Sequence, residues 1–520
     1  MIIVNDIRGS IYESRDNIIG KAAKIAGIKN PDTAFIWRRG LDARRQTPSF
    51  VYSVAFDVSG KADAQRGITV PAIYSLPQKF GTEKLSARPV IMGYGPAGIF
   101  CAYLLSLCGY APVVFEKGSE IDTRNKKVKS FFDGGSLDVN TNVQFGEGGA
   151  GTYSDGKLTT RINNPACRFI LEEMVKFGAP EDILWLAKPH IGTDKLGNVV
   201  KNIRSESIRL GAQFHFDSEI TDINIKNGKV VSVTANGVDY PCGLLVSACG
   251  HSARDVYSML KGKDIAMQGK SFSVGVRIEH LQSDVNRSLF GDFASEPILG
   301  SADYNVSYRS GSRGTYSFCM CPGGQVVAAS SEEGGLVVNG MSAYKRDDTN
   351  ANSALCVSVL AEDFGGDPFK GIAFQRELER RAFTAAGSDY SAPVQLVGDF
   401  KNGRVSKSFG KVKPSYPRRT SFCDLNSILP SFVSEGLKTG LNKFKGSYSF
   451  FGDADALLTG VETRTSAPVR ITRGENLTAI GVDGFYPCGE GAGYAGGIMS
   501  AAADGIRVAE EIISRYSPEV

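Results

Sequence analysis

Two glycine-rich segments lie far apart in the sequence, and each has the pattern of a strand-to-helix turn whose backbone can approach a ligand. One runs Gly93-Tyr-Gly95-Pro-Ala-Gly98, and the other runs Gly489-Glu-Gly491-Ala-Gly493-Tyr-Ala-Gly496-Gly497-Ile498. In a GxGxxG turn the first glycine permits the tight turn, the second lets the backbone approach a pyrophosphate, and the third lets the helix pack on its strand. Gly93, Gly95 and Gly98 fill these positions. Either segment alone is a common pattern, but the pair indicates one elongated ligand bound at both ends.

An acidic residue stands where a dinucleotide-binding unit needs one. Glu116 follows Gly93 by 23 positions and ends the next predicted strand, so its carboxylate can accept hydrogen bonds from a ribose. The helix predicted to begin at Pro96 would present free N–H groups and its positive end to the phosphates. These features indicate a dinucleotide site, and the alternative interpretation is a turn with no ligand.

Two further features favour FAD over NAD as the dinucleotide. Ala248-Cys-Gly250 follows a predicted meander and resembles the Ala-Thr-Gly step of two-dinucleotide-fold flavoproteins, which passes close to the adenosine half. The turn at Gly489 precedes a helix predicted from about Ile498, whose positive end would stabilise negative charge on the N1 side of a reduced flavin. We therefore predict bound FAD. Only one βαβ signature is evident, so electrons would come from NAD(P)H docking transiently, from the substrate or from a protein donor.

A third segment, residues 144–158, is too rich in glycine for an ordinary connection. Its small residues would let the backbone lie against a flat ring or a phosphate, and Thr152, Ser154 and Lys157 can donate hydrogen bonds. A mobile surface loop is the alternative. The complete set of predicted cofactor-binding residues is Gly93, Gly95, Pro96, Ala97, Gly98, Glu116, Lys117, Arg124, Gly148, Gly149, Gly151, Thr152, Ser154, Lys157, Ile220, Ala248, Gly250, Gly489, Glu490, Gly497 and Ile498.

Candidate reactive groups include two thiols that are two positions apart. Cys319 and Cys321 flank Met320, so a thiol near the flavin is one hypothesis, with Cys321 as the candidate. C-x-C spacing strains an intramolecular disulfide, and thiol reactivity needs a lowered pKa. Buried packing is the alternative for both thiols.

Three other side chains are candidates for catalysis. Arg464 can bind a substrate carboxylate in a bidentate manner, or it can pair with Glu462. Glu490 and Tyr494 belong to the second glycine segment and could reach the face of the ring.

The ten cysteines are scattered and do not suggest a disulfide framework. No CxxC pair occurs, and the four histidines are dispersed, so no metal site is predicted.

The elements that would position these residues divide the chain into four parts. Residues 1–80 alternate as a small βαββ domain, with a linker over residues 58–86. Residues 87–270 hold the first part of a Rossmann-like FAD-binding domain, ending in strands at 214–225, 229–235 and 238–240 that are joined by two Asn-Gly pairs, a strong hairpin signal. Residues 271–454 form a predicted inserted substrate domain, mainly β with helices. Residues 455–520 complete the FAD-binding domain.

Composition excludes several classes of protein. A chain of 520 residues with 42% hydrophobic and 22% charged residues should form two to four globular domains. The net charge of +4 does not favour nucleic acid binding, although Arg38, Arg39, Arg44 and Arg45 could form a basic surface. No apolar stretch is long enough to span a membrane, and the first residues lack a signal-peptide pattern, so we predict a cytoplasmic protein.

Longer strings resemble one bacterial family. They are NVQFGEGGAGTYSDGKL at 142–158, YSFCMCPGG at 316–324, VVNGMS at 337–342, TGVETRTSAPVR at 459–470 and YPCGEGAGYAGG at 486–497. Over nearly its whole length the chain is similar to the uncharacterised FAD-dependent dehydrogenases, also called NAD(FAD)-utilising dehydrogenases. This resemblance implies a glutathione-reductase-like FAD fold with an inserted substrate domain. It implies no particular substrate, because the family is named for its cofactor.

These observations predict an FAD-dependent oxidoreductase of α/β fold class. Hydride would move between flavin N5 and a small organic substrate bound between the FAD-binding and inserted domains. One alternative is a flavin-dependent RNA-modifying enzyme that uses the arginines of the N-terminal domain. Another is a non-catalytic flavin-binding regulatory protein. The sequence specifies neither the substrate nor the oligomeric state.

Overall fold

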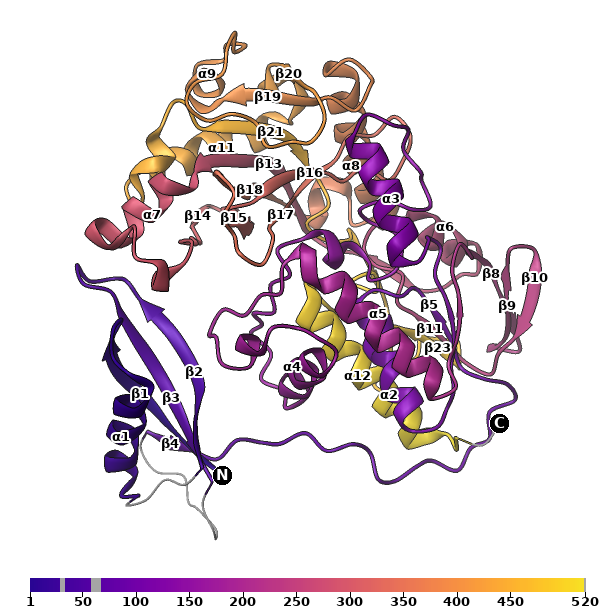
Figure 1. Cartoon of the computed structure of the whole chain (residues 1–520). Helices are drawn as coiled ribbons and strands as arrows, with labels where there is room; N and C mark the ends of the chain where they lie inside the picture. The colour runs from indigo at the N-terminus through magenta and orange to yellow at the C-terminus, as the bar shows by residue number, and fades with distance from the viewer. Residues whose placement is uncertain (29–32, 58–66, 519–520) are drawn as a thin grey trace.

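The structure, a computed structural model, describes residues 1–28, 33–57 and 67–518. It is a mixed α/β structure in which a small N-terminal sheet, a central parallel sheet and a large sheet occupy separate regions (Figure 1). Residues from the central and the large sheet line one shared cavity. Among the residues described, no helix has the length and apolarity to cross a membrane.

The N-terminal unit is an antiparallel sheet of order β2–β3–β1–β4 with one helix packed on it. Its elements are β1 (Ile2–Ser10), α1 (Arg15–Ala26), β2 (Ala34–Asp42), β3 (Ser49–Phe56) and β4 (Ile68–Thr69). The helix begins after Ser14, whose side chain accepts a hydrogen bond from the Asn17 N–H, and ends at Gly27 with a φ of 69°. The predicted order of strand, helix, strand and strand is confirmed. Residues 58–66 of the predicted linker lie outside the described residues.

The N-terminal unit contacts the rest of the molecule through β2. The Arg39 N–H donates to the Trp185 carbonyl (2.6 Å), and the Ala187 N–H donates to the Arg39 carbonyl (2.9 Å). The Arg39 guanidinium lies 4.6 Å from the ring centroids of both Trp185 and Phe50. Backbone pairing and cation–π contacts therefore hold this unit against the segment at residues 185–187.

A five-stranded parallel sheet of order β23–β11–β5–β6–β7 is central to the second region. Its strands are β5 (Val90–Met92), β6 (Val113–Phe115), β7 (Gln213–His215), β11 (Leu245–Ser247) and β23 (Phe485–Pro487). Every residue of β5, β11 and β23 is buried, because this sheet is covered on both faces. The predicted strand–turn–helix–strand unit is confirmed, with α2 (Pro96–Leu107) between β5 and β6.

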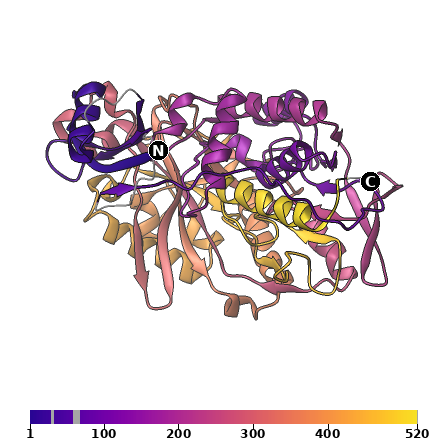
Figure 2. The ribbon, with the colours of Figure 1, turned by 90° about the horizontal axis from the view of Figure 1, so that it is seen from below.

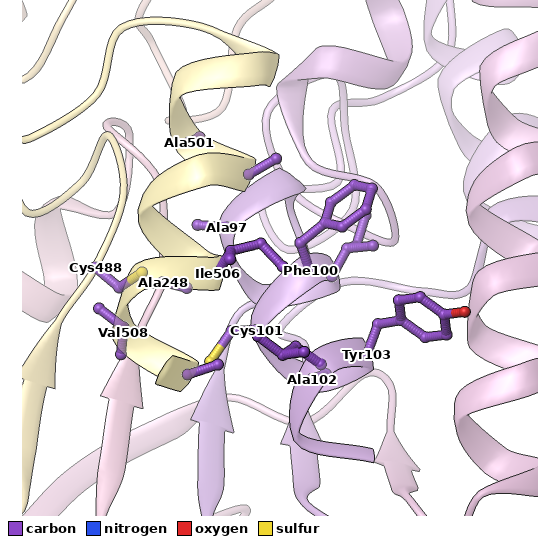
Figure 3. Close-up of a cluster of buried hydrophobic side chains, with 14 of the residues drawn as sticks. Ala97, Phe100, Cys101, Ala102, Tyr103, Ala248, Cys488, Ala501, Ile506 and Val508 are labelled. Carbon is purple, nitrogen blue, oxygen red and sulfur yellow. The ribbon is translucent and has the colours of Figure 1, made fainter. Parts of the chain in front are cut away.

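Helices cover one face of the parallel sheet. They are α2, α4 (Ala166–Lys176), α5 (Thr193–Arg209) and α12 (Ile498–Arg515). A Cβ at Gly505 of α12 would clash with the Ala97 carbonyl oxygen, so α12 and α2 approach closely at small residues. Figure 3 shows buried side chains at this contact, including Ala97, Cys101 and Ala501. The helix predicted from about Ile498 to Arg515 is confirmed.

The other face carries a meander and one helix. These elements are β8 (Ile220–Lys226), β9 (Lys229–Ala235), β10 (Val238–Pro241) and α6 (Arg254–Gly262). Both Asn-Gly pairs join its strands, and all four of their residues have positive φ, as type I′ turns require. The single strand predicted over residues 214–225 is wrong. Residues 213–215 belong to β7, and Asp217, with a φ of 49°, breaks the chain away before β8 begins.

The large sheet has seven strands in the described part of the chain. In spatial order they are β14 (Ser307–Ser310), β15 (Arg313–Cys321), β18 (Asn350–Val359), β13 (Phe272–Leu281), β21 (Leu457–Glu462), β19 (Ala392–Leu396) and β20 (Thr420–Phe422). The helices α8 (Pro368–Ala385) and α11 (Ser431–Phe444) pack against it. The runs predicted as strands at 271–278, 315–320 and 325–329 are confirmed in β13, β15 and β16 (Gln325–Ala328).

Shorter elements complete the description. They are α3 (Ile121–Phe132), α7 (Gln282–Phe290), α9 (Val397–Asn402), α10 (Leu425–Ile428), β12 (Met267–Gly269), β17 (Val338–Met341) and β22 (Val469–Ile471). β12 pairs with β22 where the chain enters and leaves the region of the large sheet. β21 lies in the large sheet between β13 and β19, although we predict residues 455–520 as part of the FAD-binding domain. The domain boundaries themselves stay predictions.

The segment between the N-terminal unit and β5 has no helix or strand over residues 70–86. It runs along the lower side of the molecule in Figure 1 and reaches the end of α12. There the Gly81 N–H donates to the Ile513 carbonyl (2.8 Å), and the Ser517 N–H donates to the Glu83 carbonyl (2.8 Å). Figure 2, seen from below, shows this segment and α12 on the same side.

Candidate functional site

One cavity of about 940 Å³ lies between the parallel sheet and the large sheet. Such a volume is in the upper part of the roughly 300–1,000 Å³ range of small-molecule sites. Met92, Phe115 and Ala248, at or just beyond the carboxyl ends of three parallel strands, line one part. Ligands of open parallel sheets bind beyond these strand ends. Phe318 and Asn339, from the region of the large sheet, line another part.

Four segments of small residues meet in the first part, which we call the glycine end. They are residues 93–98, 146–151, 248–250 and 489–497. A Cβ on Gly149 would lie 3.0 Å from the Gly95 Cα, and a Cβ on Gly93 would lie 2.6 Å from the Ala248 carbonyl oxygen. Backbone therefore lies directly on backbone. The structure brings together the segments that the sequence indicated separately.

Two helices begin at the glycine end. α2 starts at Pro96 and α12 starts at Ile498, and both residues line the cavity. Neither start has a side-chain cap or an acidic residue in its first turn. The N–H groups and dipoles of both helices therefore favour an anionic ligand such as a pyrophosphate.

Most of the predicted cofactor-binding residues line this cavity. They are Gly93, Gly95, Pro96, Ala97, Glu116, Lys117, Gly149, Gly151, Ser154, Lys157, Ile220, Ala248, Gly250, Glu490, Gly497 and Ile498. Five others do not line it and lie behind the wall: Gly98, Arg124, Gly148, Thr152 and Gly489. For these five the structure shows supporting contacts.

Arg124 supports the third glycine segment from inside the protein. Its fully buried guanidinium donates to the carbonyl oxygens of Asn142 (3.0 Å), Val143 (3.0 Å) and Glu147 (2.6 Å). One side chain thus satisfies several backbone acceptors of a loop that has no helix or strand there. Arg124 therefore stabilises the loop and does not line the cavity.

The remaining four are positions of close packing. A Cβ on Gly98 would clash with the Gly93 carbonyl, which fits the third glycine of the turn. A Cβ on Gly148 would clash with the Thr152 hydroxyl oxygen. Gly489 has a φ of 73°, a left-handed conformation that favours glycine.

Glu116 lines the cavity, but its carboxylate is already engaged. It accepts hydrogen bonds from the N–H groups of Tyr94 (2.9 Å), Gly118 (3.0 Å) and Gly146 (3.0 Å). A carboxylate has about four acceptor sites, so one remains for a ribose hydroxyl. The adjacent Lys117 is held by two carboxylates on the meander side.

The part of the cavity beside the large sheet, which we call the side-chain end, contains the candidate thiols. Its lining residues include Asp155, Lys188, Asp303, Tyr304, Ser317, Phe318, Cys319, Met320, Asn339, Arg346, Glu462 and Arg464. Cys319 lines it and Cys321 does not, because Cys321 points into the interior. Cys321 therefore does not face the cavity directly, and a catalytic role for it stays a prediction. The alternation of side chains between the two faces of β15 is broken between Phe318 and Cys321, and the sequence pattern does not reveal this irregularity.

Arg464 does not pair with Glu462. Its guanidinium makes a bidentate contact with Glu379 (3.1 and 3.0 Å), and it donates to the Ser331 hydroxyl. Arg254 of α6 binds the same carboxylate (2.9 and 2.8 Å). Burial opposes ionisation of Glu379, but the two guanidinium groups hold its pKa well below the ordinary value. Arg464 is thus part of a buried ion cluster and is not free for a substrate carboxylate.

Glu490 and Tyr494 line the cavity but differ in their freedom. The Tyr494 hydroxyl accepts from the Arg473 N–H (3.2 Å) and donates to the Ile471 carbonyl (3.1 Å). Glu490 Oε1 lies 3.7 Å from Nδ1 of His251, and the buried Nε2 of His251 has no hydrogen-bond partner among the described residues. The structure therefore leaves Glu490, with His251, as the more available acid–base group.

Sequence reasoning missed two ion pairs at the side-chain end. Arg346 binds Asp155 through two hydrogen bonds (2.8 and 2.5 Å), and Lys188 binds Asp303 (2.6 Å). Asp155 stands in the third glycine segment, so that segment was a usable signal. Arg346 and Asp303 belong to no motif, because tertiary structure alone brings them to the cavity.

The region of the large sheet has a recognisable family. Residues 271–465 match the family described as FAD-dependent protein, C-terminal domain-like, and the match spans all seven strands of that sheet. This finding supports FAD as the cofactor. A protein of Clostridium beijerinckii (strain ATCC 51743 / NCIMB 8052), described as uncharacterized, is 47% identical over 528 residues and covers 99% of both chains. The chain belongs to the same family as this clostridial protein.

Solved structures of flavoproteins are similar over most of the chain. The flavin-dependent brominase Bmp2 is 14% identical and covers 82% of this chain and 78% of its own, with a TM-score of 0.37. Glycine oxidase from Bacillus cereus ATCC 14579 is 11% identical and covers 82% and 94%, with a TM-score of 0.32. At these TM-scores the similarity adds nothing to the assignment of a site or a reaction.

Proposed function

We propose that this protein is an FAD-dependent oxidoreductase that moves hydride between the flavin and a small organic substrate. The observation that carries the proposal is the meeting of four small-residue segments and two uncapped helix starts at one end of a single cavity. The other end of that cavity is lined by side chains from the region that matches an FAD-dependent family. When bound, FAD would supply a two-electron acceptor and donor of hydride.

The glycine end fits the dinucleotide part of the cofactor. Gly93, Gly95 and Gly149 leave backbone without side chains, and the start of α2 directs N–H groups at the place where a pyrophosphate would lie. Glu116 would use its remaining acceptor site for the ribose. The start of α12 at Ile498 would stabilise negative charge on the reduced ring.

The side-chain end would hold the substrate. Arg346 with Asp155 and Lys188 with Asp303 give this part fixed charges of both signs. Because each pair is already satisfied, a polar substrate can be oriented without leaving an unpaired charge in the protein. His251 and Glu490 would hold or pass a proton at the boundary between the two ends.

A spectrum of the purified protein tests the cofactor, and an anaerobic titration tests the reaction. We expect flavin absorbance, release of FAD on denaturation, and bleaching of the spectrum by NADH, by NADPH or by a reducing substrate. A protein that neither retains FAD nor binds it on reconstitution would overturn the proposal. A bound flavin that no acceptor reoxidises after photoreduction would instead indicate the non-catalytic alternative.

The RNA-modifying alternative gains no support from the N-terminal unit. Arg39 is stacked between Trp185 and Phe50, and Arg44 binds Asp42 (2.8 Å). Two of the four arginines that could form a basic surface are therefore engaged within the protein. Retention of RNA at low salt, lost at higher salt, would reinstate this alternative.

A further inference from the structure

Two thiols lie at an irregularity of the large sheet, on the wall of the side-chain end. In the pairing of β15 with β18 the register shifts between Phe318 and Cys321, and Cys319 has a φ of 44°. A left-handed conformation costs energy in a residue with a side chain and is often found at functional bulges. This bulge exposes Cys319 to the cavity and buries Cys321 behind it.

One buried guanidinium contacts both cysteines. The Cys321 thiol donates to the Cys319 carbonyl (3.4 Å). Nη2 of the fully buried Arg277 donates to the Cys319 carbonyl (2.9 Å) and lies 3.7 Å from the Cys321 sulfur. Nη1 of Arg277 pairs with Glu462 (3.2 Å). Lys157 reaches the same loop by donating to the Met320 carbonyl.

These neighbours stabilise the thiolate form of Cys319. The charged and titratable groups that act on it are Cys321, Arg277, Lys157, Asp155 and Glu462. The adjacent Cys321 thiol, with Arg277 and Lys157, lowers the pKa of Cys319 to about 6, against burial and Asp155. Burial raises the pKa of Glu462 to about 7. Near neutral pH this carboxyl is therefore only partly ionised, and it neutralises the Arg277 charge less than a fully ionised carboxylate would.

Cys319 differs in this respect from every other cysteine of the chain. Burial raises the pKa of Cys101, Cys108, Cys167, Cys242, Cys249, Cys356, Cys423 and Cys488. For Cys321 the adjacent Cys319 side chain, then burial, raise the pKa. Near neutral pH these shifts favour a thiolate at Cys319, on the cavity wall, with the protonated thiol of Cys321 behind it.

We propose that Cys319 and Cys321 form a dithiol that reduces small disulfides in the side-chain end of the cavity. The Cys319 thiolate attacks a disulfide RSSR′, forms a mixed disulfide with RS and releases R′S⁻, which takes a proton from solvent. Cys321 then attacks the Cys319 sulfur, and RS⁻ leaves with the Cys321 proton. Two electrons pass to the substrate, which departs as two thiols, and the protein keeps a Cys319–Cys321 disulfide. The C-x-C spacing strains this disulfide and so makes it easier to reduce.

The arrangement activates the two thiols in the required order. Once Cys319 is in a mixed disulfide, it no longer carries the negative charge that raises the pKa of Cys321. The lowering effect of Arg277 on Cys321 remains. Arg277 is therefore a positioning residue that supports the first thiolate and then the second.

Repeated turnover needs a two-electron reductant for the Cys319–Cys321 disulfide. The reduced form of the FAD proposed for the same cavity would be such a reductant, so turnover rests on the proposed function. The single exchange does not rest on it, because that exchange uses only the two thiols and the substrate. An experiment on the single exchange therefore separates the two proposals.

The test is the reaction of the reduced, full-length protein with 2,2′-dithiodipyridine, with and without bound flavin. Absorbance follows the released pyridine-2-thione, and peptide mass spectrometry assigns each cysteine. The half-exposed Cys423, whose thiol donates to the Ala385 carbonyl, is the internal reference. We expect Cys319 to react about tenfold or more faster than Cys423 near neutral pH. Its rate should be half-maximal near pH 6, and two thiones should be released as the peptide loses two hydrogens.

Variants separate the two roles. Cys321→Ser should stop at a stable mixed disulfide on Cys319 with one thione released, and Cys319→Ser should leave both positions unreacted. Cys356→Ser, which alters an equally buried thiol on β18, is the matched control and should retain the two-thione exchange. Thermal unfolding of each variant shows that it is folded.

Either of two results would overturn the proposal. In one, Cys319 reacts no faster than Cys423. In the other, the mixed disulfide on Cys319 persists in the wild-type protein although Cys321 is reduced. Loss of FAD binding changes neither readout, so a failure of the proposed function is distinguishable from a failure of this inference.

Discussion

The two ends of the cavity are built from different materials. The glycine end is backbone against backbone, with Gly149 on Gly95 and Gly93 on Ala248. The side-chain end is made of long charged side chains that are paired across the cavity wall, such as Arg346 with Asp155. A ligand at the first end is recognised by shape and helix dipoles, and a ligand at the second by placed charges and thiols. One cavity therefore combines a site that local motifs determine with a site that tertiary contacts determine.

Removing the buried Glu379 carboxylate tests whether the side-chain end depends on buried charge, and we expect it to lower stability more than the other changes below. Glu379→Gln would remove the buried carboxylate that joins Arg254 and Arg464, and the partly exposed Glu332 would remain beside Arg254. We expect the free energy of unfolding to fall by about 3–5 kcal/mol, measured by denaturant titration.

The matched control lies on the same helix. Glu377 forms an exposed pair with Arg381, so Glu377→Gln should cost less than about 1 kcal/mol. Equal losses for the two variants would show that the buried cluster adds nothing beyond a surface ion pair, and the contrast between the ends would fail.

A second prediction concerns the pH dependence of the side-chain end. Burial raises the pKa of Glu462 from 4.5 to about 7 in the folded protein. The neutral form is therefore favoured by folding, and this contribution is present below about pH 4.5 and lost as pH rises through 7. Relative to Glu462→Gln, the wild-type free energy of unfolding should fall by roughly 2–3 kcal/mol over that range. Denaturant titrations at several pH values measure the difference, and a constant difference would contradict the prediction.

A third prediction sharpens the account of the glycine end. Gly95 has an ordinary φ of −86°, and a Cβ there would lie 3.7 Å from the Gly149 Cα, so the protein alone accepts a methyl group. Gly95→Ala should leave the stability of the flavin-free protein within about 0.5 kcal/mol. It should weaken FAD about tenfold, because the added methyl keeps the pyrophosphate from the backbone. Fluorescence titration of the flavin-free protein measures this affinity.

Gly20→Ala is the control for that change. Gly20 lies in α1 with nothing within 4 Å of an added Cβ, so the variant should bind FAD as the wild type does. If Gly95→Ala binds FAD equally well, the backbone at Gly95 does not approach the ligand.

The smallest expected effect separates packing from catalysis at the boundary of the two ends. Tyr494→Phe removes a hydroxyl whose hydrogen-bond partners among the described residues are the Arg473 N–H and the Ile471 carbonyl. We expect a loss of about 1 kcal/mol in stability and an unchanged rate of flavin reduction by stopped-flow. A large drop in that rate with unchanged stability would restore Tyr494 as a catalytic candidate.

The sequence predicts the glycine end well, because its determinants are local. Glycine spacing, the strand before Gly93, the helix after it and two Asn-Gly turns each act within a few residues. The side-chain end is harder, because a bulge reverses which thiol of Cys319 and Cys321 reaches the cavity. The partner of Arg464 comes from α8, far along the chain, so proximity in sequence to Glu462 was misleading. The structural role of Arg124 is equally hard to predict, because no motif distinguishes a buried arginine from an exposed one.

The order of the strands in the parallel sheet has a consequence for folding during synthesis. β5 and α2 leave the ribosome early, but β23 and α12, which lie beside β11 and α2, are made only after the whole large sheet. Until then the face of α2 that carries Ala97 and Cys101 has no partner helix, and the start of α12 is missing. We therefore expect nascent chains to fold the large sheet first and to take up the cofactor only after synthesis is complete.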